Sequence, residues 1–571
     1  MLVYGDTSER ADLNECLTEL GRACADVRRM PRSLERHDRL VGVLIEGGRL
    51  LQGLADDDLA HLGSDRRTED AAALTYFLVS VGTAVGDSWR GADFDLPDPP
   101  MMHRLRCGTL KQPEGYAFYA LYPEAYAEAA RRIALKAPPR VIGIRSIGAS
   151  LGAVVAASVG ARTFFTLRPV GNPSARELAV SPELERELLD GDAHFLIVDE
   201  GPGRSGSSFC AVADWLQERG VSLDHVTFLP SHGDEPGPEA TDAHRALWRL
   251  VDKSVADWGA RLPLLLERRV TDLLGELETP LVDVSAGAWR QKVYGSAADW
   301  PAAAANWDRR KFLARAAGKQ WLVKFAGLGT MGRRKLEMAR ALRAHGLAPE
   351  PAGLVHGFLV ECWHGGAARL QSGEKPIAEI AHYLATRARL FPAEREEGAS
   401  MQELYVMARR NVALLLGDEA AAGLARWEPH IGSLERRVRR VRTDNRLDRH
   451  EWVRLADGRL SKTDGVDHFA AHDLIGAQDL AWDIAGATIE FGLSPLERAV
   501  LAAEVGPPVD PELLEFLLLA YPAFRAGQCR LAAESTAEAA ERQRLQARTD
   551  GYLACLEEHT CPATRRESAL A

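Results

Sequence analysis

The feature of this 571-residue chain that most constrains its fold is the segment His194–Phe209. Its apolar run ends at Asp199 and Glu200, a loop of glycine and serine follows, and an apolar, helix-compatible stretch begins at Phe209. This order predicts a buried strand, a loop and a helix. Backbone N–H groups of such a loop bind phosphate, and acids at the strand end suit ribose hydroxyls or Mg²⁺. The segment therefore predicts a site for a phosphorylated sugar or a nucleotide.

Composition limits the other possibilities. The length predicts three or four domains, and the formal net charge of −11 argues against a general nucleic-acid coat. The eight cysteines form no CxxC pair, so the sequence indicates neither a zinc ribbon nor a disulfide framework. No window approaches 18 continuous apolar residues, and the N-terminus lacks the pattern of a signal peptide. We expect a cytoplasmic protein that does not cross a membrane.

Changes in hydrophobic period divide the chain into four parts. We expect a mainly helical region at 1–135, an α/β domain at 136–235, a helical linker at 236–299, and a further domain with a helical C-terminal lobe at 300–571.

The α/β part alternates short apolar strands with helices. Strands are predicted at 141–145, 161–168, 195–198 and 226–229, with an alanine-rich helix at 150–159. This alternation favours a doubly wound parallel sheet. Ligands bind beyond the carboxyl ends of the strands in such sheets. Three polar loops, at 145–148, 168–176 and 199–208, should converge at that edge.

These three loops together resemble the type I phosphoribosyltransferases over about residues 110–235. The resemblance implies that Asp199 and Glu200 are the catalytic acids that hold the ribose hydroxyls, and that Ser146 and Gly148 face a pyrophosphate with Mg²⁺. It also implies a set of phosphate-binding residues in the three loops: Arg145, Arg168, Arg176, Gly203, Arg204, Ser205, Gly206, Ser207 and Ser208. The acidic-pair loop is one residue longer than the usual one and lacks its Thr-Gly.

The second half contains the ordered elements of phosphoryl transfer. Lys324 ends the second strand of a predicted hairpin at 311–325, and a helix carrying Glu337 follows. Another strand is predicted at 357–363, and Asp444 and Asp464 lie further along the chain. Over about residues 300–530 this order resembles the aminoglycoside-phosphotransferase branch of the protein-kinase fold, and so implies a two-lobed α+β domain.

That resemblance implies roles for the residues in this order. Lys324 would hold the phosphates of ATP and pair with Glu337, and Asp444 would be the catalytic carboxylate. Asp464 would bind Mg²⁺, and Asp483 would brace the catalytic loop. Two positions depart from the family pattern: Arg442 stands in place of a histidine, and Glu451 in place of the metal-binding asparagine. Glutamate also ligates Mg²⁺, so Glu451 is the second expected metal ligand.

The leading hypothesis is therefore a phosphoribosyltransferase-like enzyme fused to a kinase-like phosphotransferase. The alternative is a regulator that senses a nucleotide or ribose phosphate without turnover. A third possibility is an RNA-modifying enzyme that uses the basic run 436–442, although a solvated helix face is the simpler interpretation of that run. His450, His468 and His472 could form a metal site, but hydrogen-bonded or solvent-facing histidines are the simpler interpretation.

Overall fold

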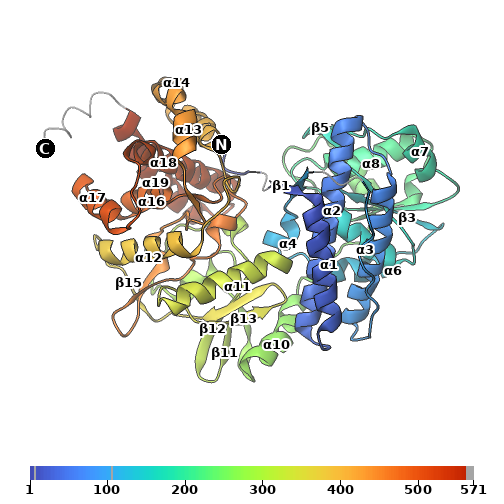
Figure 1. The fold of residues 1–571 in the computed structure, drawn as a ribbon, viewed down its shortest axis with the longest axis horizontal. Coiled ribbons are helices and arrows are strands. Elements are labelled where there is room, and N and C mark those ends of the chain that lie inside the picture. Colours follow the sequence, from blue (N-terminus) through green and yellow to red (C-terminus); the bar gives the residue numbers. More distant parts are fainter. Residues whose placement is uncertain (6–7, 104–106, 561–571) are drawn as a thin grey trace. The chain divides into compact units, whose positions relative to one another are not determined.

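The computed structural model describes residues 1–5, 8–103 and 107–560, and the chain forms two compact units (Figure 1). Unit 1 comprises Met1–Thr7, Glu267–Ala326 and Gly332–Ala571, and unit 2 comprises Ser8–Leu266 and Gly327–Met331. The seven cysteines within the described residues are free thiols, and Cys561 lies outside them.

Unit 2 is built on a parallel sheet, as the sequence predicts. Its strand order is β4-β3-β7-β8-β9, and every pairing is parallel. The strands are β3 (Pro139–Ile144), β4 (Phe165–Leu167), β7 (His194–Val198), β8 (Val226–Leu229) and β9 (Asp252–Lys253). All five residues of β7 are buried, which explains why the strand is continuously apolar.

Helices cover this sheet. They are α1 (Leu13–Arg29), α2 (Leu34–Leu62), α3 (Glu69–Trp89), α4 (Glu114–Phe118), α5 (Pro123–Arg131), α6 (Gly148–Ser158), α7 (Pro182–Leu188), α8 (Ser207–Glu218) and α9 (Asp242–Leu250). Two small antiparallel ladders accompany them: β1 (Ser8–Asp12) with β2 (Cys107–Lys111), and β5 (Val170–Asn172) with β6 (Ala175–Glu177).

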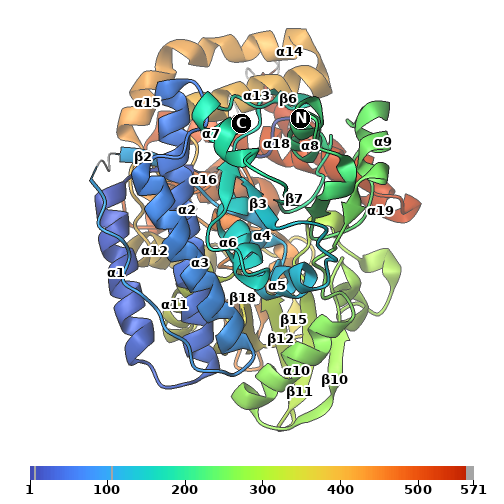
Figure 2. The same ribbon diagram turned by 90° about the vertical axis from the view of Figure 1, so that its right-hand side faces the viewer.

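The N-terminal helices and the sheet belong to the same unit. Helix α6 packs on β3, and α3 packs on α6 (Figure 2). A Cβ on Gly82 of α3 would lie 2.9 Å from the carbonyl oxygen of Ala153, so the two helices are in close backbone contact. The predicted division at 135/136 is therefore not a boundary between compact units. The change of hydrophobic period there marks the start of a sheet that the preceding helices cover.

One described helix, α3, is long and apolar enough to cross a membrane by length and composition. In the structure 61% of its apolar window is buried, and it packs on α2 and α6. Its apolar character is that of a core helix.

Unit 1 contains an antiparallel sheet with strand order β10-β11-β12-β14-β13. The strands are β10 (Leu277–Asp283), β11 (Lys311–Ala316), β12 (Lys319–Phe325), β13 (Pro351–Val355) and β14 (Phe358–Cys362). Helix α11 (Gly329–Ala344) follows β12, and its Met338 and Leu342 share a hydrophobic cluster with Leu359 of β14. The predicted hairpin, helix and strand are all present.

The range 236–299 differs from the predicted helical linker. It contains α9, α10 (Arg261–Leu274), β9 and β10, and so gives a strand to each of the two sheets. Strand β10 is an edge strand with exposed residues and an internal proline, Pro280. Edge strands tolerate proline and need no buried face, so the segment lacks the alternation that identifies a strand.

The rest of unit 1 is mainly helical. The helices are α12 (Ile377–Leu390), α13 (Met401–Leu416), α14 (Asp418–Ala422), α15 (Ile431–Arg437), α16 (Leu480–Phe491), α17 (Pro495–Glu504), α18 (Pro511–Ser535) and α19 (Ala539–Thr560). Short strands β15 (Ala368–Arg369), β17 (Trp452–Arg454) and β18 (Leu460–Lys462) form one sheet, and β16 (Arg440–Val441) pairs with β19 (Gln478–Asp479). Trp452 and Trp482 are buried in the large core, as expected of packing residues.

Candidate functional sites

The loop that carries Asp444 in unit 1 is held by Asp483 of α16. The carboxylate of Asp483 accepts hydrogen bonds from the backbone N–H of Asp444 at 2.8 Å and from that of Asn445 at 2.9 Å. Asn445 has φ +71°, and its side chain donates to the carbonyl of Gly476 at 2.7 Å. Burial, and then the charge of Asp444, raise the pKa of Asp483 to about 6. The predicted bracing of this loop by Asp483 is confirmed.

The side chain of Asp444 is enclosed. Its Oδ2 accepts a hydrogen bond from Tyr383 and lies 3.4 Å from Nζ of Lys462. Its Oδ1 is met by the backbone N–H of Arg446 at 3.4 Å. The buried guanidinium of Arg387 donates to Tyr383 at 3.0 Å and fixes the phenol in place. Asp444 is thus oriented by partners on both of its carboxylate oxygens.

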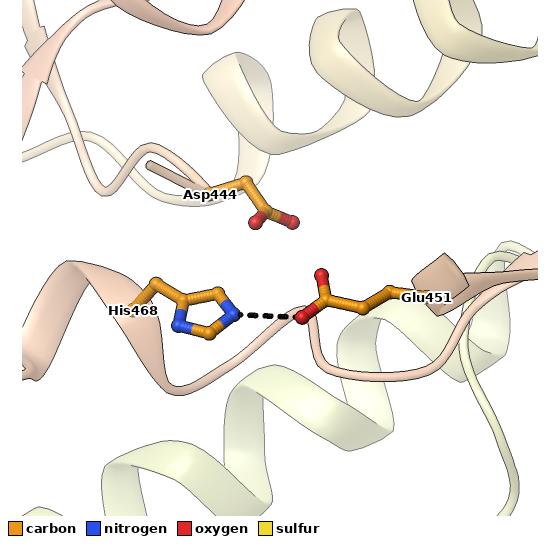
Figure 3. Close-up of side chains that lie close together, drawn as sticks. All are labelled: Asp444, Glu451 and His468. Atoms are coloured by element: carbon orange, nitrogen blue, oxygen red, sulfur yellow. Dashed lines mark hydrogen bonds and ion pairs between the residues drawn. The ribbon is translucent and has the colours of Figure 1, made fainter. Parts of the chain in front are cut away.

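Glu451 lies opposite Asp444, immediately before β17 (Figure 3). Its Oε2 is 2.5 Å from Nζ of Lys462, and its Oε1 is 3.3 Å from Nε2 of His468. Ligand-type atoms of Asp444, Glu451 and His468 lie within 4.8 Å of one another. Burial by itself would raise the pKa of Glu451, but Lys462 and His468 hold it well below the usual value.

Lys324 lies on β12 and is 2% exposed. Its Nζ is 2.6 Å from Asp464 and 2.5 Å from Asp467. Burial by itself would lower the pKa of Lys324, but these two acids hold it well above its usual value. Lys324 and Asp464, which are 140 positions apart in the sequence, are therefore in direct contact.

Helix α11 does not present Glu337 to Lys324. Glu337 is exposed, and Lys335 is the buried residue of this turn. The ammonium of Lys335 donates to Asp467 at 2.7 Å, so both lysines share that carboxylate. The expected pairing of Glu337 with Lys324 is therefore corrected: Asp464 and Asp467 supply the negative charge that the helix was expected to supply.

Glu361 of β14 is a further buried acid near Lys324. The register pairs Leu322 with Glu361 and Lys324 with Leu359. Residues two apart on a strand share a face, so Glu361 and Lys324 lie on the same side of the sheet. Burial raises the pKa of Glu361 to about 7, against the attraction of Lys324.

The three neighbouring histidines have different partners. His468 contacts Glu451, His450 stacks on Trp289 with centroids 5.7 Å apart, and His472 lies 5.0 Å from the ring of Tyr4. These three histidines therefore do not form a common metal site.

Three arginines of the basic run have partners within unit 1. Arg437 pairs with Asp510 and Glu512, and Arg442 pairs with Glu397 at 2.8 Å. Arg440 is buried and donates to the carbonyls of Ala399 and Ala477. Three of the five arginines in the run are therefore engaged inside the protein, while Arg436 and Arg439 are exposed.

In unit 2 the three predicted loops start at the same edge of the parallel sheet. Ile144 pairs with Leu167, and Gly143 pairs with Val198, so strands β3, β4 and β7 end side by side. The loops are also bonded to one another. Nη1 of Arg168 donates to the carbonyl of Arg145 at 2.6 Å. Serine hydroxyls of the third loop donate hydrogen bonds to the second loop.

Asp199 and Glu200 stand at the end of β7 without an ion pair among the described residues. Asp199 accepts a hydrogen bond from the backbone N–H of Glu200 at 2.8 Å, and the backbone of Gly115 hydrogen-bonds to Glu200. Burial raises the pKa of Asp199 to about 7, although Arg168 and Arg176 oppose the shift. Burial, with the negative charges of Glu114 and Asp199, raises that of Glu200 to about 8. Two adjacent acids with raised pKa values are typical of functional sites.

Arg145 and Arg168 are engaged by acids of unit 2 itself. The guanidinium of Arg145, 1% exposed, is 2.8 Å from Asp56 and 2.5 Å from Asp65. Arg168 also pairs with Asp56, and its Nη2 is 3.4 Å from the hydroxyl of Ser146. Arg145 is therefore not placed as a phosphate clamp, because its donors are used to position the loop. Arg176 donates to the carbonyl of Pro169 at 3.4 Å.

Gly148 is small for a packing reason. A Cβ on Gly148 would lie 2.8 Å from the carbonyl oxygen of Val198, and a Cβ on Gly143 would lie 2.0 Å from the carbonyl oxygen of Gly148. The close backbone approach that was expected at Gly148 is therefore an approach to the backbone of the neighbouring strands.

The loop before α8 is shaped by Gly203 and Gly206, with φ of +59° and +70°. The hydroxyls of Ser205 and Ser207 donate to the carbonyl of Pro173 at 2.8 and 2.7 Å, which ties this loop to the second one.

Gly206 is the N-cap of α8, and no side chain caps this helix. Ser208 lies in its first turn and is half-buried. The exposed Arg204 pairs with Glu239 at 2.7 Å. The N–H of Ser207 donates to Oγ of Ser205 at 3.3 Å, and the other backbone N–H groups of this first turn are of the kind that a phosphate would suit.

No local sequence pattern pointed to several charged residues of the two sites, namely the buried Lys335, Glu361, Lys462, Asp467 and Asp65 and the half-buried Asp56. Each depends on partners that are distant in the chain, such as Arg145 for Asp56, 89 positions away. The only local signal was a lysine two residues before Asp464.

No protein-family model matches the sequence, and no curated protein matches it. Among solved structures, the choline kinase LicA from Streptococcus pneumoniae is 16% identical with a TM-score of 0.34, over 52% of this chain and 99% of that one. A macrolide 2′-phosphotransferase type I is 14% identical with a TM-score of 0.32, over 51% and 95%. The aminoglycoside phosphotransferase APH(3'')-Id from Streptomyces rimosus, in complex with ADP and streptomycin, is 16% identical with a TM-score of 0.26, over 41% and 95%. These likenesses are weak and concern the fold.

Proposed function

We propose that unit 1 is an ATP-dependent phosphotransferase that acts on a small molecule. The observation that carries this proposal is the double hydrogen bond from Asp483 to the backbone of Asp444 and Asn445. It fixes a carboxylate next to Glu451 in the manner that the kinase-like resemblance implies. The strand order β10-β11-β12-β14-β13, with Lys324 on the third strand and α11 next, supports the same function.

The residues have distinct tasks in this proposal. Lys324, released from Asp464, would hold the phosphates of ATP, because its ammonium remains charged over the physiological range. Asp444 would orient the acceptor hydroxyl through Oδ1, since Tyr383 and Lys462 occupy its Oδ2. Its contribution is positioning and acceptance of the proton.

Asp464 is the residue that fits Mg²⁺. Its side chain is 22% exposed, and only its Oδ1 is bonded to Lys324, while Oδ2 is 3.9 Å from His468. Bound there, Mg²⁺ would neutralise charge on the transferred phosphate. Glu337, which is exposed, has no part in this proposal.

We further propose that unit 2 binds a ribose phosphate in the manner of a phosphoribosyltransferase. The observation in favour is the combination of two half-buried acids with raised pKa values at the end of β7 with the N-terminus of α8, whose N-cap Gly206 has no side chain. Asp199 and Glu200 would accept hydrogen bonds from the ribose hydroxyls. Gly203 and the first turn of α8 would hold the 5′-phosphate. Displacement at the anomeric carbon is the reaction that such a site serves.

The phosphotransferase is tested by incubating the full chain with ATP, Mg²⁺ and a cell metabolite extract. Mass spectrometry should find a metabolite that gains a phosphoryl group while ADP accumulates. Asp444→Asn and Asp464→Asn should lower the rate at least 100-fold, and the exposed Asp457→Asn should not. Equal rates in all four proteins would refute the proposal.

The ribose-phosphate site is tested by calorimetry with phosphoribosyl pyrophosphate and Mg²⁺. Binding should be lost in Asp199→Asn/Glu200→Gln and retained in Glu218→Gln, which changes an exposed acid on α8. Product formation with added nucleobases would separate an enzyme from a binding protein.

The alternative is a nucleotide-sensing regulator, and one observation favours it. The side chain of Asp444 is 0% exposed, so an acceptor reaches it only after neighbouring side chains move. A regulator would show thermal stabilisation by ATP or phosphoribosyl pyrophosphate with no consumption of either.

A further inference from the structure

The ammonium group of Lys462 lies in the centre of the Asp444 site. Lys462 is the last residue of β18, and its side chain is fully buried. Its Nζ is 2.5 Å from Oε2 of Glu451 and 3.4 Å from Oδ2 of Asp444. A buried ammonium with two carboxylates at these distances is a permanent part of the site.

The same acids are the ones that a divalent cation would use. Asp444, Glu451 and His468 offer ligand atoms within 4.8 Å of one another, from three separate segments (Figure 3). Yet both oxygens of Glu451 already have partners, Lys462 on Oε2 and His468 on Oε1. A metal ion at Glu451 would have to displace these two partners or share the carboxylate with them.

Charge balance leads to the same conclusion. Two buried carboxylates need a cation beside them, because an uncompensated buried charge is strongly unfavourable. The ammonium group of Lys462 is that cation, and it is part of the protein chain itself. A divalent ion placed between the same acids would lie within a few ångströms of the ammonium and be repelled.

We propose that Lys462 takes the place of the second metal ion of kinase-like sites, so that unit 1 uses a single divalent cation, at Asp464. Protein kinases hold two Mg²⁺ ions, one set of contacts coming from an asparagine of the catalytic loop. Here Glu451 stands at that position and is neutralised by Lys462. The assignment rests on the proposed phosphotransferase function, and it corrects the expectation that Glu451 is a metal ligand. Lys462 is then a positioning residue for Asp444.

The test counts Mn²⁺ ions bound to the full chain by electron paramagnetic resonance, without nucleotide. The wild-type chain should bind no more than one ion at this site, and Asp464→Asn should remove it. Lys462→Met should gain one ion, which the double variant Lys462→Met/Glu451→Gln should lose again. Lys319→Met, which changes an exposed lysine of β12, is the matched control and should leave the count unchanged.

Three results would overturn the proposal: a second ion at this site in the wild-type chain, no additional ion in Lys462→Met, or loss of an ion in Glu451→Gln alone. If Lys462→Met folds only when Mn²⁺ is added, the metal has replaced the ammonium and the proposal is supported. If it does not fold at all, Glu451→Gln decides, since an unchanged count supports the proposal and a lost ion refutes it. Because nucleotide is absent, failure to consume ATP would refute the proposed function without altering these counts.

Discussion

The carboxylate of Asp483 accepts a hydrogen bond from the backbone N–H of Asp444 across 39 positions of sequence. A second bond to Asn445 makes the contact bidentate and restrains a residue at φ +71°. The conformation of the loop therefore depends on one buried acid of α16.

Asp483→Asn should disturb the loop that carries Asp444 while leaving the other residues of the site unchanged. The amide keeps one acceptor but turns an NH₂ group toward a backbone N–H, so at least one charged hydrogen bond is lost. We expect a loss of about 1.5–3 kcal/mol of unfolding free energy, measured by urea denaturation, and a fall in phosphotransfer of at least tenfold. The exposed Asp418→Asn should change neither quantity. Unaltered activity in Asp483→Asn would show that the loop is held in another way.

The raised pKa values of Asp199 and Glu200 in unit 2 predict that the stability of the folded chain depends on pH. Folding raises the pKa of Asp199 from 3.8 to about 7 and that of Glu200 from 4.5 to about 8. The folded chain thus holds more protons within these windows, and its stability falls as pH rises from about 4 to about 8. Asp199→Asn/Glu200→Gln should reduce this fall and melt at a higher temperature than the wild-type chain at pH 8.

Differential scanning fluorimetry across this pH range provides the measurement, and Glu218→Gln is the control. The same double variant should lose ribose-phosphate binding, so that stability and function change in opposite directions. Parallel melting curves for variant and wild type at every pH would contradict the assignment of these two acids.

The contact between α3 and α6 predicts that a larger residue in place of Gly82 destabilises the protein. In Gly82→Ala the new Cβ would lie 2.9 Å from a backbone carbonyl oxygen of Ala153, and neither helix can yield locally. We expect a cost of about 1–3 kcal/mol, as for other overpacked cores. Gly21→Ala is the matched control in α1, where nothing lies within 4 Å. It should be neutral or stabilise the helix by up to about 1 kcal/mol. Chemical denaturation of both variants checks the difference.

Elements with a strong local pattern were predictable from the sequence. The hairpin of β11 and β12 has a tight turn at Ala317 and Gly318, both with positive φ, between apolar strands. Strand β7 is apolar throughout because both of its faces are buried. By contrast, β1 is polar and exposed, and its partner β2 lies almost a hundred residues further along the chain, so no local signal marks it.

The residues of the candidate sites also differ in whether the sequence alone could point to them. Asp199, Asp444, Asp464 and Lys324 lie near strand ends or in the order that the resemblance implies, so the sequence alone was enough to propose them as site residues. The partners that decide their chemistry come from elsewhere, as Asp65 does for Arg145, 80 positions away. The sequence also could not predict which face of α11 is buried. Lys335 and Glu337 are both long and charged, and only tertiary packing decides which of them is buried.

Glu361 of β14 should make unit 1 less stable at high pH. Its pKa is raised by burial from 4.5 to about 7, so the folded chain binds an extra proton between these values and loses stability as pH rises through them. Glu361→Gln removes the ionisable group, and the variant should be more stable than the wild-type chain at pH 8 by about 1–3 kcal/mol, with the difference vanishing near pH 4. Urea denaturation at both pH values measures it, with the exposed Glu350→Gln as control. A wild-type chain more stable than Glu361→Gln at pH 8 would mean that attraction to Lys324 outweighs burial and that Glu361 is ionised in the folded chain.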